Sequence, residues 1–415
     1  MAGRATSTPG TRRPRRLPPL CAAVAVVALV LAGCGRSEAA RPARSPLQLA
    51  QAREAADRDI AAVHESIVDR FVTHLKARQD DYAAGRSDSP AVVNFLIISG
   101  GGDWGAFGAG FLKGWGKVPP GEMTRPQFDA VTGVSTGALI APFAFLGDEQ
   151  SIEEIVRLYR NPRKDWVKPR GLLSLVRGDA AYADIPGLER ELREAVDVPM
   201  LRRIGDAGAH GRMLAVSATN VDTEEVQVWD MVEEAREAAA AGKTKRVRQI
   251  LLASSAIPGV FPPRQIGPFL YVDGGVTGNI LYGVPPNRRA NYTFFDRWRE
   301  TYPGVAPPKL RYWIIFNNEM RWAPEVVQPK WSSVLKKSLT AATRAATVSA
   351  IRQLFLQAEL ARSKYGADIE VRVVSVPDGW VAPVQEPFNR KTMNALADLG
   401  ERMGAEPASW RAESP

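Results

Sequence analysis

The chain has 415 residues, of which 45% are hydrophobic and 24% are charged, enough apolar material for one large core or two ordinary ones. Its formal net charge is +9. No basic stripe interleaved with aromatic residues occurs, so a nucleic-acid-binding protein is not indicated. The sequence has no HExxH pattern and no cluster of histidines or cysteines, so no metal site is implied.

The N-terminus has the pattern of a targeting segment. An arginine-rich stretch precedes the apolar run Leu20–Leu31, which is too short to span a bilayer well. The run ends in Leu-Ala-Gly-Cys34, which resembles the lipobox of bacterial lipoprotein precursors. That resemblance implies a signal peptide over residues 1–33, a lipid on Cys34 and an exported, membrane-anchored protein. Gly35 after the cysteine favours the outer membrane, facing the periplasm. The alternative is an ordinary secretory signal with a chance cysteine.

The next segments lead from the anchor to the main domain. Residues 34–46 are polar and contain proline, which is typical of a tether. Apolar residues then recur at roughly helical spacing over 47–83, and the pattern breaks at 85–90. We therefore expect an N-terminal helical segment over residues 47–90.

Two units of strand, glycine turn and helix follow in series. The first is Val92–Ile98 with the small-residue helix 106–115, and the second is Phe128–Thr132 with the helix 138–146. Such units favour an α/β fold, which we expect to have three layers, a mainly parallel central sheet and helices on both faces.

The remaining pattern extends this domain over residues 91–380. It predicts irregular helix over 150–205, strands over 213–218, 225–229, 269–272, 310–317 and 369–376, and helices over 231–256, broken at Gly242, and 331–363. Residues 381–415 show no clear pattern, and we expect them to form a C-terminal tail.

A glycine-rich motif, Gly100–Gly105, joins the first strand to its helix. It fits the G-x-G-x-x-G fingerprint of dinucleotide-binding proteins. Dinucleotide-binding proteins carry an acidic residue at the end of a second strand, about 20 positions after the motif. Glu122 lies near that distance, but it is in a loop rich in proline and glycine and does not end a strand. The motif also suits an oxyanion hole built from the amides of Gly100, Gly101 and Gly102, or a tight turn without chemistry.

Two further motifs carry a nucleophile and a carboxylate. Gly133–Gly137 reads G-x-S-x-G, the pattern of a nucleophile elbow, with Ser135 at its centre. Asp273 follows the strand 269–272 and precedes two glycines. Taken alone, the second motif fits a simple turn as well as a catalytic carboxylate.

The histidines separate the possible mechanisms. An α/β-hydrolase places its histidine base late in the chain, but only His64, His74 and His210 occur, and all precede Asp273. A serine without a base is a poor nucleophile, and an ionised aspartate within hydrogen-bond reach can take its proton. Asp273 is the best placed candidate.

Together and in this order, the three motifs resemble those of the patatin-like phospholipase family, over about residues 92–290. The resemblance includes residues 253–263, which look like the family's segment before its aspartate. It implies a Ser–Asp dyad of Ser135 and Asp273, with Gly100, Gly101 and Gly102 as the oxyanion loop. One departure is Trp104, where many members carry a basic residue.

The expected function is therefore lipid acyl hydrolysis, as a phospholipase or esterase, through an acyl-serine intermediate. The expected substrates are membrane lipids, and no metal or other cofactor is implied. One alternative is an acyltransferase on the same scaffold. A second is a catalytically weak lipid-binding lipoprotein, and a dinucleotide-binding protein is the third.

Overall fold

The computed structural model describes residues 41–88, 90–171, 180–282 and 294–415. The expected signal peptide 1–33 and Cys34 lie outside the described residues. Residues 44–171 and 180–415 form one compact unit that contains every described helix and strand. This unit carries its own core, which is the property of a part that can fold alone.

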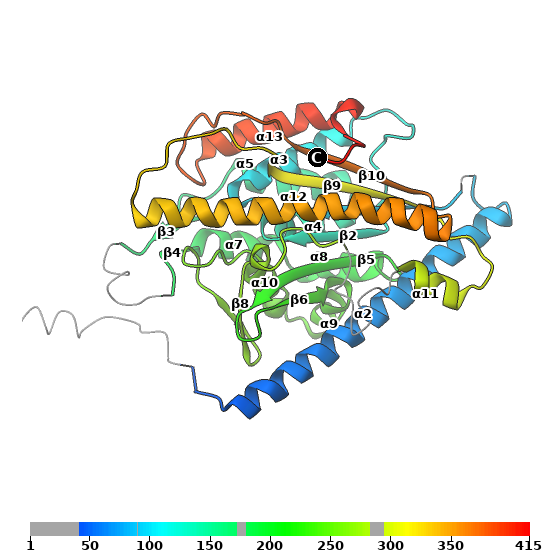
Figure 1. The fold of residues 1–415 in the computed structure, drawn as a ribbon, viewed down its shortest axis with the longest axis horizontal. Coiled ribbons are helices and arrows are strands. Elements are labelled where there is room, and N and C mark those ends of the chain that lie inside the picture. Colours follow the sequence, from blue (N-terminus) through cyan, green and yellow to red (C-terminus); the bar gives the residue numbers. More distant parts are fainter. Residues whose placement is uncertain (1–40, 89, 172–179, 283–293) are drawn as a thin grey trace, which may run out of the picture. The chain divides into compact units, whose positions relative to one another are not determined.

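A mainly parallel sheet forms the centre of this unit (Figure 1). Five strands run parallel and in the order β10, β9, β1, β2 and β5. Their bounds are Ile369–Val376 (β10), Lys309–Glu319 (β9), Val92–Ile98 (β1), Ala130–Val134 (β2) and Met213–Asn220 (β5). Neighbouring parallel strands end at the same edge of the sheet. The turns that follow β1 and β2 therefore lie side by side.

Antiparallel strands complete the sheet beyond β5. They are β6 (Glu225–Asp230) and β8 (Phe269–Val272), which both pair with β5, and β7 (Arg264–Ile266), which pairs with β8. We did not expect β7, because its three residues follow a proline-rich segment and are too few for an alternating pattern. A separate two-stranded sheet joins β3 (Lys168–Pro169) to β4 (Ala183–Asp184).

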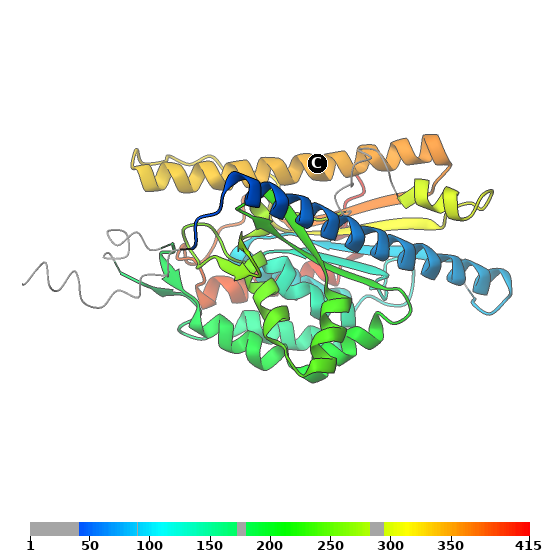
Figure 2. The ribbon, with the colours of Figure 1, turned by 90° about the horizontal axis from the view of Figure 1, so that it is seen from below.

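Helices cover both faces of the sheet, as Figure 2 shows. The face that includes Phe95 and Ile97 of β1 packs against one set of helices, and the face that includes Leu96 and Ile98 packs against another. Because both faces are buried, the strand is apolar at every position except Asn94. The first set is α2 (Pro46–Ala83), α11 (Phe294–Thr301) and α12 (Trp331–Tyr365). The second is α3 (Gly105–Trp115), α4 (Thr136–Leu146), α5 (Glu149–Arg160), α7 (Pro186–Ala195), α8 (Val198–Ala207), α9 (Met231–Ala241), α10 (Lys245–Ser254) and α13 (Arg390–Gly404).

The long helix α2 begins at a capping box. The Ser45 side chain accepts a hydrogen bond from the Gln48 backbone, Gln48 Oε1 accepts one from the Ser45 backbone, and Pro46 takes the first helical position. Its buried residues include Ile67, Phe71 and Leu75, which lie on one face. No helix in the described ranges combines the length and the apolar composition needed to cross a bilayer.

Residues 381–415, which we expected to form a tail, contain the buried helix α13. A Cβ on Gly110 of α3 would lie 2.1 Å from the Ala397 carbonyl oxygen, and one on Gly400 would lie 2.1 Å from the Phe107 carbonyl oxygen. The two helices therefore pack backbone against backbone, which only glycine allows at these positions. The pattern escaped sequence reading because small residues, rather than large apolar ones, form the contact.

Candidate active site

Ser135 lies at the sharp turn between β2 and α4. Its backbone has φ 55° and ψ −125°, a conformation that costs free energy for any residue with a Cβ. The flanking glycines make the turn possible. A Cβ on Gly137 would lie 2.2 Å from the Ile98 carbonyl oxygen, and one on Gly133 would lie 2.2 Å from the Gly137 carbonyl oxygen. The sharp turn that a nucleophile elbow requires is therefore present at Ser135.

One edge of β5 brings the two motifs together. β2 pairs with this edge as far as Val134 opposite Ser217, and β8 pairs with its continuation from Thr219 opposite Val272. The opposite edge of β5 is taken by β6. Because β2 and β8 approach from opposite directions, their C-terminal ends meet beside β5. The residues that follow them, including Ser135, are adjacent as a result.

Ser135 and Asp273 form a direct hydrogen bond. The Ser135 Oγ donates to Asp273 Oδ2 at 2.5 Å, and Asp273 Oδ1 accepts from the Gly275 backbone at 2.8 Å. The residues are only 5% and 6% exposed. The Gly275 bond fixes the carboxylate so that its second oxygen faces the hydroxyl, which is the arrangement a base needs.

Two serines that sequence reading did not single out hold the elbow in place. Ser254 Oγ accepts from the Ser135 backbone at 2.9 Å and donates to the Ser217 carbonyl oxygen at 2.6 Å. Ser255 Oγ donates to the Ser135 carbonyl oxygen at 3.1 Å. Both belong to the segment 253–263, whose resemblance to the family was noted without a role for any residue.

The glycine loop after β1 lies beside the serine. A Cβ on Gly100 would lie 3.0 Å from Ser135 Cβ. Gly100 donates its N–H to the Asn279 carbonyl oxygen at 3.2 Å, so this amide is already engaged and is a poor oxyanion donor. The N–H groups of Gly101 and Gly102 have no acceptor within the described residues. Of the three expected donors, the geometry leaves these two available.

Asn317, at the end of β9, clamps this loop. Its Nδ2 donates to the Ser99 carbonyl oxygen, its backbone donates to Ser99 Oγ, and its Oδ1 accepts from Gly108 at the start of α3, with distances of 2.9, 2.9 and 3.0 Å. The side chain is fully buried. Sequence reading missed it, and the only signal was a polar residue directly after the apolar run of β9.

The family comparison agrees with this arrangement. Residues 96–284, which run from the last residues of β1 through Ser135, β8 and Asp273, match the family model described as patatin-like phospholipase. These residues form a patatin-like phospholipase domain. Members of the family are typically lipid acyl hydrolases, so the match supports lipid hydrolase activity in general. The α/β architecture with its mostly parallel sheet is the patatin fold.

Comparison with other proteins adds little detail. No curated protein matches the sequence. Among solved structures, VipD from Legionella pneumophila is similar to this chain with 12% sequence identity and a TM-score of 0.35, over 78% of this chain and 68% of that one. Similarity at this level carries no inference about the activity.

Burial changes the acidity of Asp273 in the patatin-like domain. Loss of solvent raises the pKa of Asp273 to about 6, against the opposing effects of the hydrogen bonds from Ser135 and Gly275. A carboxylate must be ionised to accept the serine proton. We therefore expect kcat/KM for a short-chain nitrophenyl ester to rise about tenfold per pH unit below pH ~6 and to level off above it. A flat profile through this range would remove Asp273 as the base.

The loop of the patatin-like domain offers a matched pair of glycine substitutions. A Cβ on Gly101 would lie 2.2 Å from the Asn317 carbonyl oxygen, so Gly101→Ala must displace the loop. A Cβ on Gly102 would meet only Phe388 Cζ at 4.0 Å, although φ is +62°. Gly101→Ala should lower kcat on the order of 100-fold or more, since one oxyanion donor is worth that much. Gly102→Ala should lower the stability by roughly 1 kcal/mol, and it should lower kcat much less than Gly101→Ala does. Equal kcat for both, measured on folded protein, would contradict this loop's role.

Trp104 occupies the position where many family members carry a basic residue. Its ring lies 5.8 Å from that of Trp322 and 5.3 Å from that of Trp380. The neighbouring Asp103 accepts a hydrogen bond from the Phe388 backbone at 2.9 Å, and burial raises the pKa of its carboxyl. An aromatic cluster therefore flanks the glycine loop of the patatin-like domain.

None of the three histidines bonds to the dyad. His74 Nε2 lies 3.1 Å from Asp129 Oδ1, where it joins α2 to the residue before β2. His64 is half-buried on α2, and burial lowers its pKa. His210 is exposed in the turn that follows α8.

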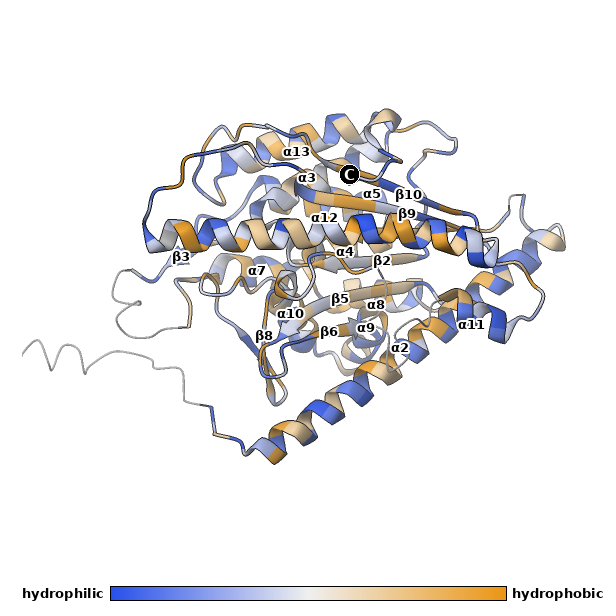
Figure 3. Cartoon of the chain, in the orientation of Figure 1, coloured by the Kyte–Doolittle hydropathy of each residue, from blue (hydrophilic) through white to orange (hydrophobic). Residues whose placement is uncertain are grey.

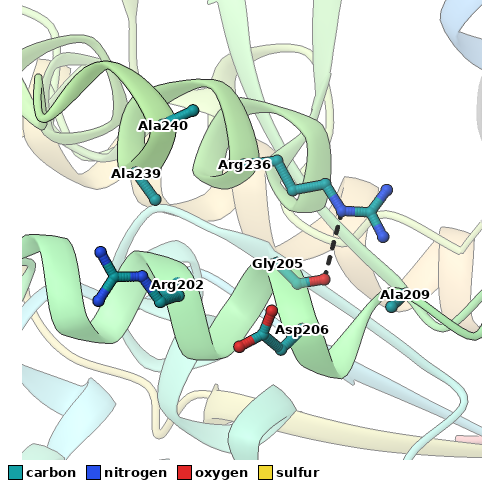
Figure 4. Close-up of a pocket in the computed structure, with 7 residues that line it drawn as sticks. All are labelled: Arg202, Gly205, Asp206, Ala209, Arg236, Ala239 and Ala240. Atoms are coloured by element: carbon teal, nitrogen blue, oxygen red, sulfur yellow. Dashed lines mark hydrogen bonds between the residues drawn. The ribbon is translucent and has the colours of Figure 1, made fainter.

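A hollow of about 420 Å³ lies between α8 and α9 (Figure 4). Its lining includes none of the site residues, and Arg236 crosses it to donate to the Gly205 carbonyl oxygen at 3.3 Å. The hollow is therefore separate from the candidate active site. Within the described ranges, no group of three acidic, histidine or cysteine side chains is placed to hold a metal ion.

Proposed function

We propose that this protein hydrolyses carboxylic esters of membrane lipids through a dyad of Ser135 and Asp273. The observation that carries the proposal is the 2.5 Å hydrogen bond between Ser135 Oγ and Asp273 Oδ2 at a strained elbow. Strain of this kind persists where the surrounding structure enforces it, and here the turn directs the Ser135 hydroxyl toward Asp273. The family match supports lipid hydrolysis in general, and the dyad and the reaction steps are our proposal.

The proposed reaction has two halves. Asp273 takes the Ser135 proton while Oγ attacks the acyl carbonyl carbon, and the resulting oxyanion accepts hydrogen bonds from the Gly101 and Gly102 amides. The intermediate collapses, the alcohol leaves with the proton from Asp273, and an acyl-serine remains. Asp273 then takes a proton from water, which attacks the acyl-serine, and the fatty acid leaves as the proton returns to Ser135.

Active-site labelling and product analysis test the proposal. A fluorophosphonate should form a covalent adduct on Ser135, located by peptide mass spectrometry, and the protein should release fatty acid from one or more phospholipid classes. Labelling with transfer of the acyl group to an added alcohol, in preference to water, would instead support an acyltransferase. Absence of both labelling and turnover would support a lipid-binding protein.

We also propose that Cys34 anchors the protein to a membrane, facing the periplasm from the outer membrane. The support is the sequence Leu-Ala-Gly-Cys at the end of an apolar run. Cys34→Ser should prevent incorporation of labelled palmitate and should leave the unprocessed precursor on a denaturing gel, because the thiol is the lipid acceptor. Labelled palmitate still entering the mutant protein would refute the lipobox interpretation.

A further inference from the structure

The outward face of α12 carries an apolar stripe with no partner in the described structure. The stripe consists of six exposed residues: Trp331 (73% exposed), Val334 (48%), Leu335 (59%), Leu339 (43%), Leu356 (65%) and Leu360 (62%). Figure 3 shows hydrophobic turns toward both ends of this helix. These residues form two groups, 331–339 and 356–360, which together span roughly 44 Å at 1.5 Å per residue.

The stripe is separate from the face by which α12 packs. The buried residues of the helix include Ile351, Leu354 and Ala358, which belong to the core under the sheet. Each residue turns the helix by 100°, so the middle of the buried face and the middle of the stripe lie roughly 150° apart around the helix axis. The helix is thus apolar on two opposite faces, and the fold uses only one of them. Large apolar residues gathered on an exposed face mark an interaction surface.

The N-terminal half of α12 has hardly any structural role in the fold. No described residue between Trp331 and Ala346 is buried. This half nevertheless lies close to the candidate site, because Lys337 and Arg344 sit 4.8 and 5.5 Å from the Trp322 ring, which in turn packs against Trp104 of the oxyanion loop. Farther along, Gln353 accepts a hydrogen bond from the Tyr282 hydroxyl at 3.0 Å.

The charge around the stripe identifies its partner. Residues 326–360, which contain the whole stripe, hold five cationic side chains and one acidic one, Glu359. Lys330 and Lys336 are exposed and form no salt bridge within the described ranges, whereas Lys337 pairs with Glu325. A helix with exposed apolar residues beside unpaired cations suits the interface of an anionic bilayer, where it lies in the plane. A second copy would bring like charges together, which disfavours a dimer through this face.

We infer that α12 is a membrane-docking helix, whose stripe enters an anionic phospholipid surface and brings the candidate active site to it. This inference rests on the proposed function, because a lipid hydrolase must reach substrates that are held in a bilayer. Docking by α12 would place the aromatic cluster around Trp104 next to that surface. Binding then combines apolar transfer from water with attraction to the lipid head groups.

Vesicle sedimentation tests the inference without the lipid anchor and without turnover. The protein is the chain from Gly35 onward, which holds the whole compact unit, with Ser135→Ala. It should sediment with vesicles of equal parts phosphatidylcholine and phosphatidylglycerol, and much less with phosphatidylcholine alone. Leu335→Asp with Leu339→Asp should weaken binding about tenfold or more, because both side chains lose their transfer into hydrocarbon.

A matched control separates the stripe from net charge. Val221→Asp with Val305→Asp adds the same two charges at exposed valines outside the stripe, 40% and 37% exposed, and should bind anionic vesicles much more tightly than the leucine variant. Equal binding by the two variants, or no binding by the parent, would overturn the inference. Light scattering could instead show that the parent protein is a dimer and that only the leucine variant is a monomer. That result would also overturn the inference, because the stripe would then be a subunit interface.

Failure of the docking inference is distinguishable from failure of the proposed function. Fluorophosphonate labelling of the chain with intact Ser135 does not require a bilayer. Labelling without vesicle binding would overturn docking alone, whereas vesicle binding without labelling would overturn the proposed hydrolysis alone.

Discussion

Asp273→Asn is expected to lower lipid ester hydrolysis on the order of 10⁴-fold, because the amide keeps the shape of the carboxylate and cannot take the Ser135 proton. The measurement is kcat for a short-chain nitrophenyl ester and for a phospholipid, with folding checked by circular dichroism. Asp129→Asn is the matched control. Asp129 is also buried, at 4% exposure, but it bonds to His74 and Arg78 outside the site.

The histidines supply the contrasting result. His64→Ala and His210→Ala should retain activity, because neither side chain bonds to the dyad. His74→Ala should also retain activity in the protein that folds, although loss of its contact with Asp129 should lower the melting temperature. A folded His210→Ala protein with activity reduced a thousandfold would restore a histidine-based mechanism in place of the Ser–Asp dyad.

The same Asp273→Asn change should stabilise the protein at neutral pH. The pKa of Asp273 is raised from 3.8 to about 6 by burial, so its ionised form is disfavoured in the folded state and stability falls as the pH rises through this range. The difference corresponds to roughly 3 kcal/mol above pH ~6. Thermal unfolding should show the gain at pH ~8 and little of it at pH ~4, where both side chains are neutral.

Ser135→Ala is expected to abolish turnover and fluorophosphonate labelling together, because no other hydroxyl lies in the same position relative to Asp273. The elbow should survive, since alanine faces the same backbone strain at φ 55° as serine. Ser375→Ala is the control. Ser375 is buried in β10, and its Oγ has no hydrogen-bond partner in the described part of the chain. Substantial turnover in a folded Ser135→Ala protein would reject Ser135 as the nucleophile.

The parts of the fold that sequence reading predicted are those with a strong local pattern. β1 was expected over Val92–Ile98 and lies there, because a strand buried on both faces is a continuous apolar run. The helices on either side of Gly242 were expected as one broken helix, and α9 and α10 end and begin around it. Ser135 and Asp273 were singled out because a polar residue next to glycines at the end of a predicted strand can be recognised from the sequence alone.

The parts that were missed depend on contacts between distant segments. Nothing in the sequence around Asn317 shows that its amide reaches Ser99, more than two hundred positions earlier. The engagement of the Gly100 amide by Asn279 is equally invisible, because it depends on how the chain folds back after Asp273. Helix α13 was overlooked because its contact with α3 uses glycines rather than large apolar residues.

The order of strands has a consequence for how the chain folds during synthesis. The residues matched by the family end at 284, yet β1 lies between β2 and β9, and β9 comes from residues 309–319. A ribosome must therefore make more than two hundred further residues before β1 gains its second neighbour and Asn317 reaches the glycine loop. Pairings between such distant segments form slowly, and the nascent chain stays open meanwhile. We therefore expect the sheet to close around β1 only after residues 309–319 have been made.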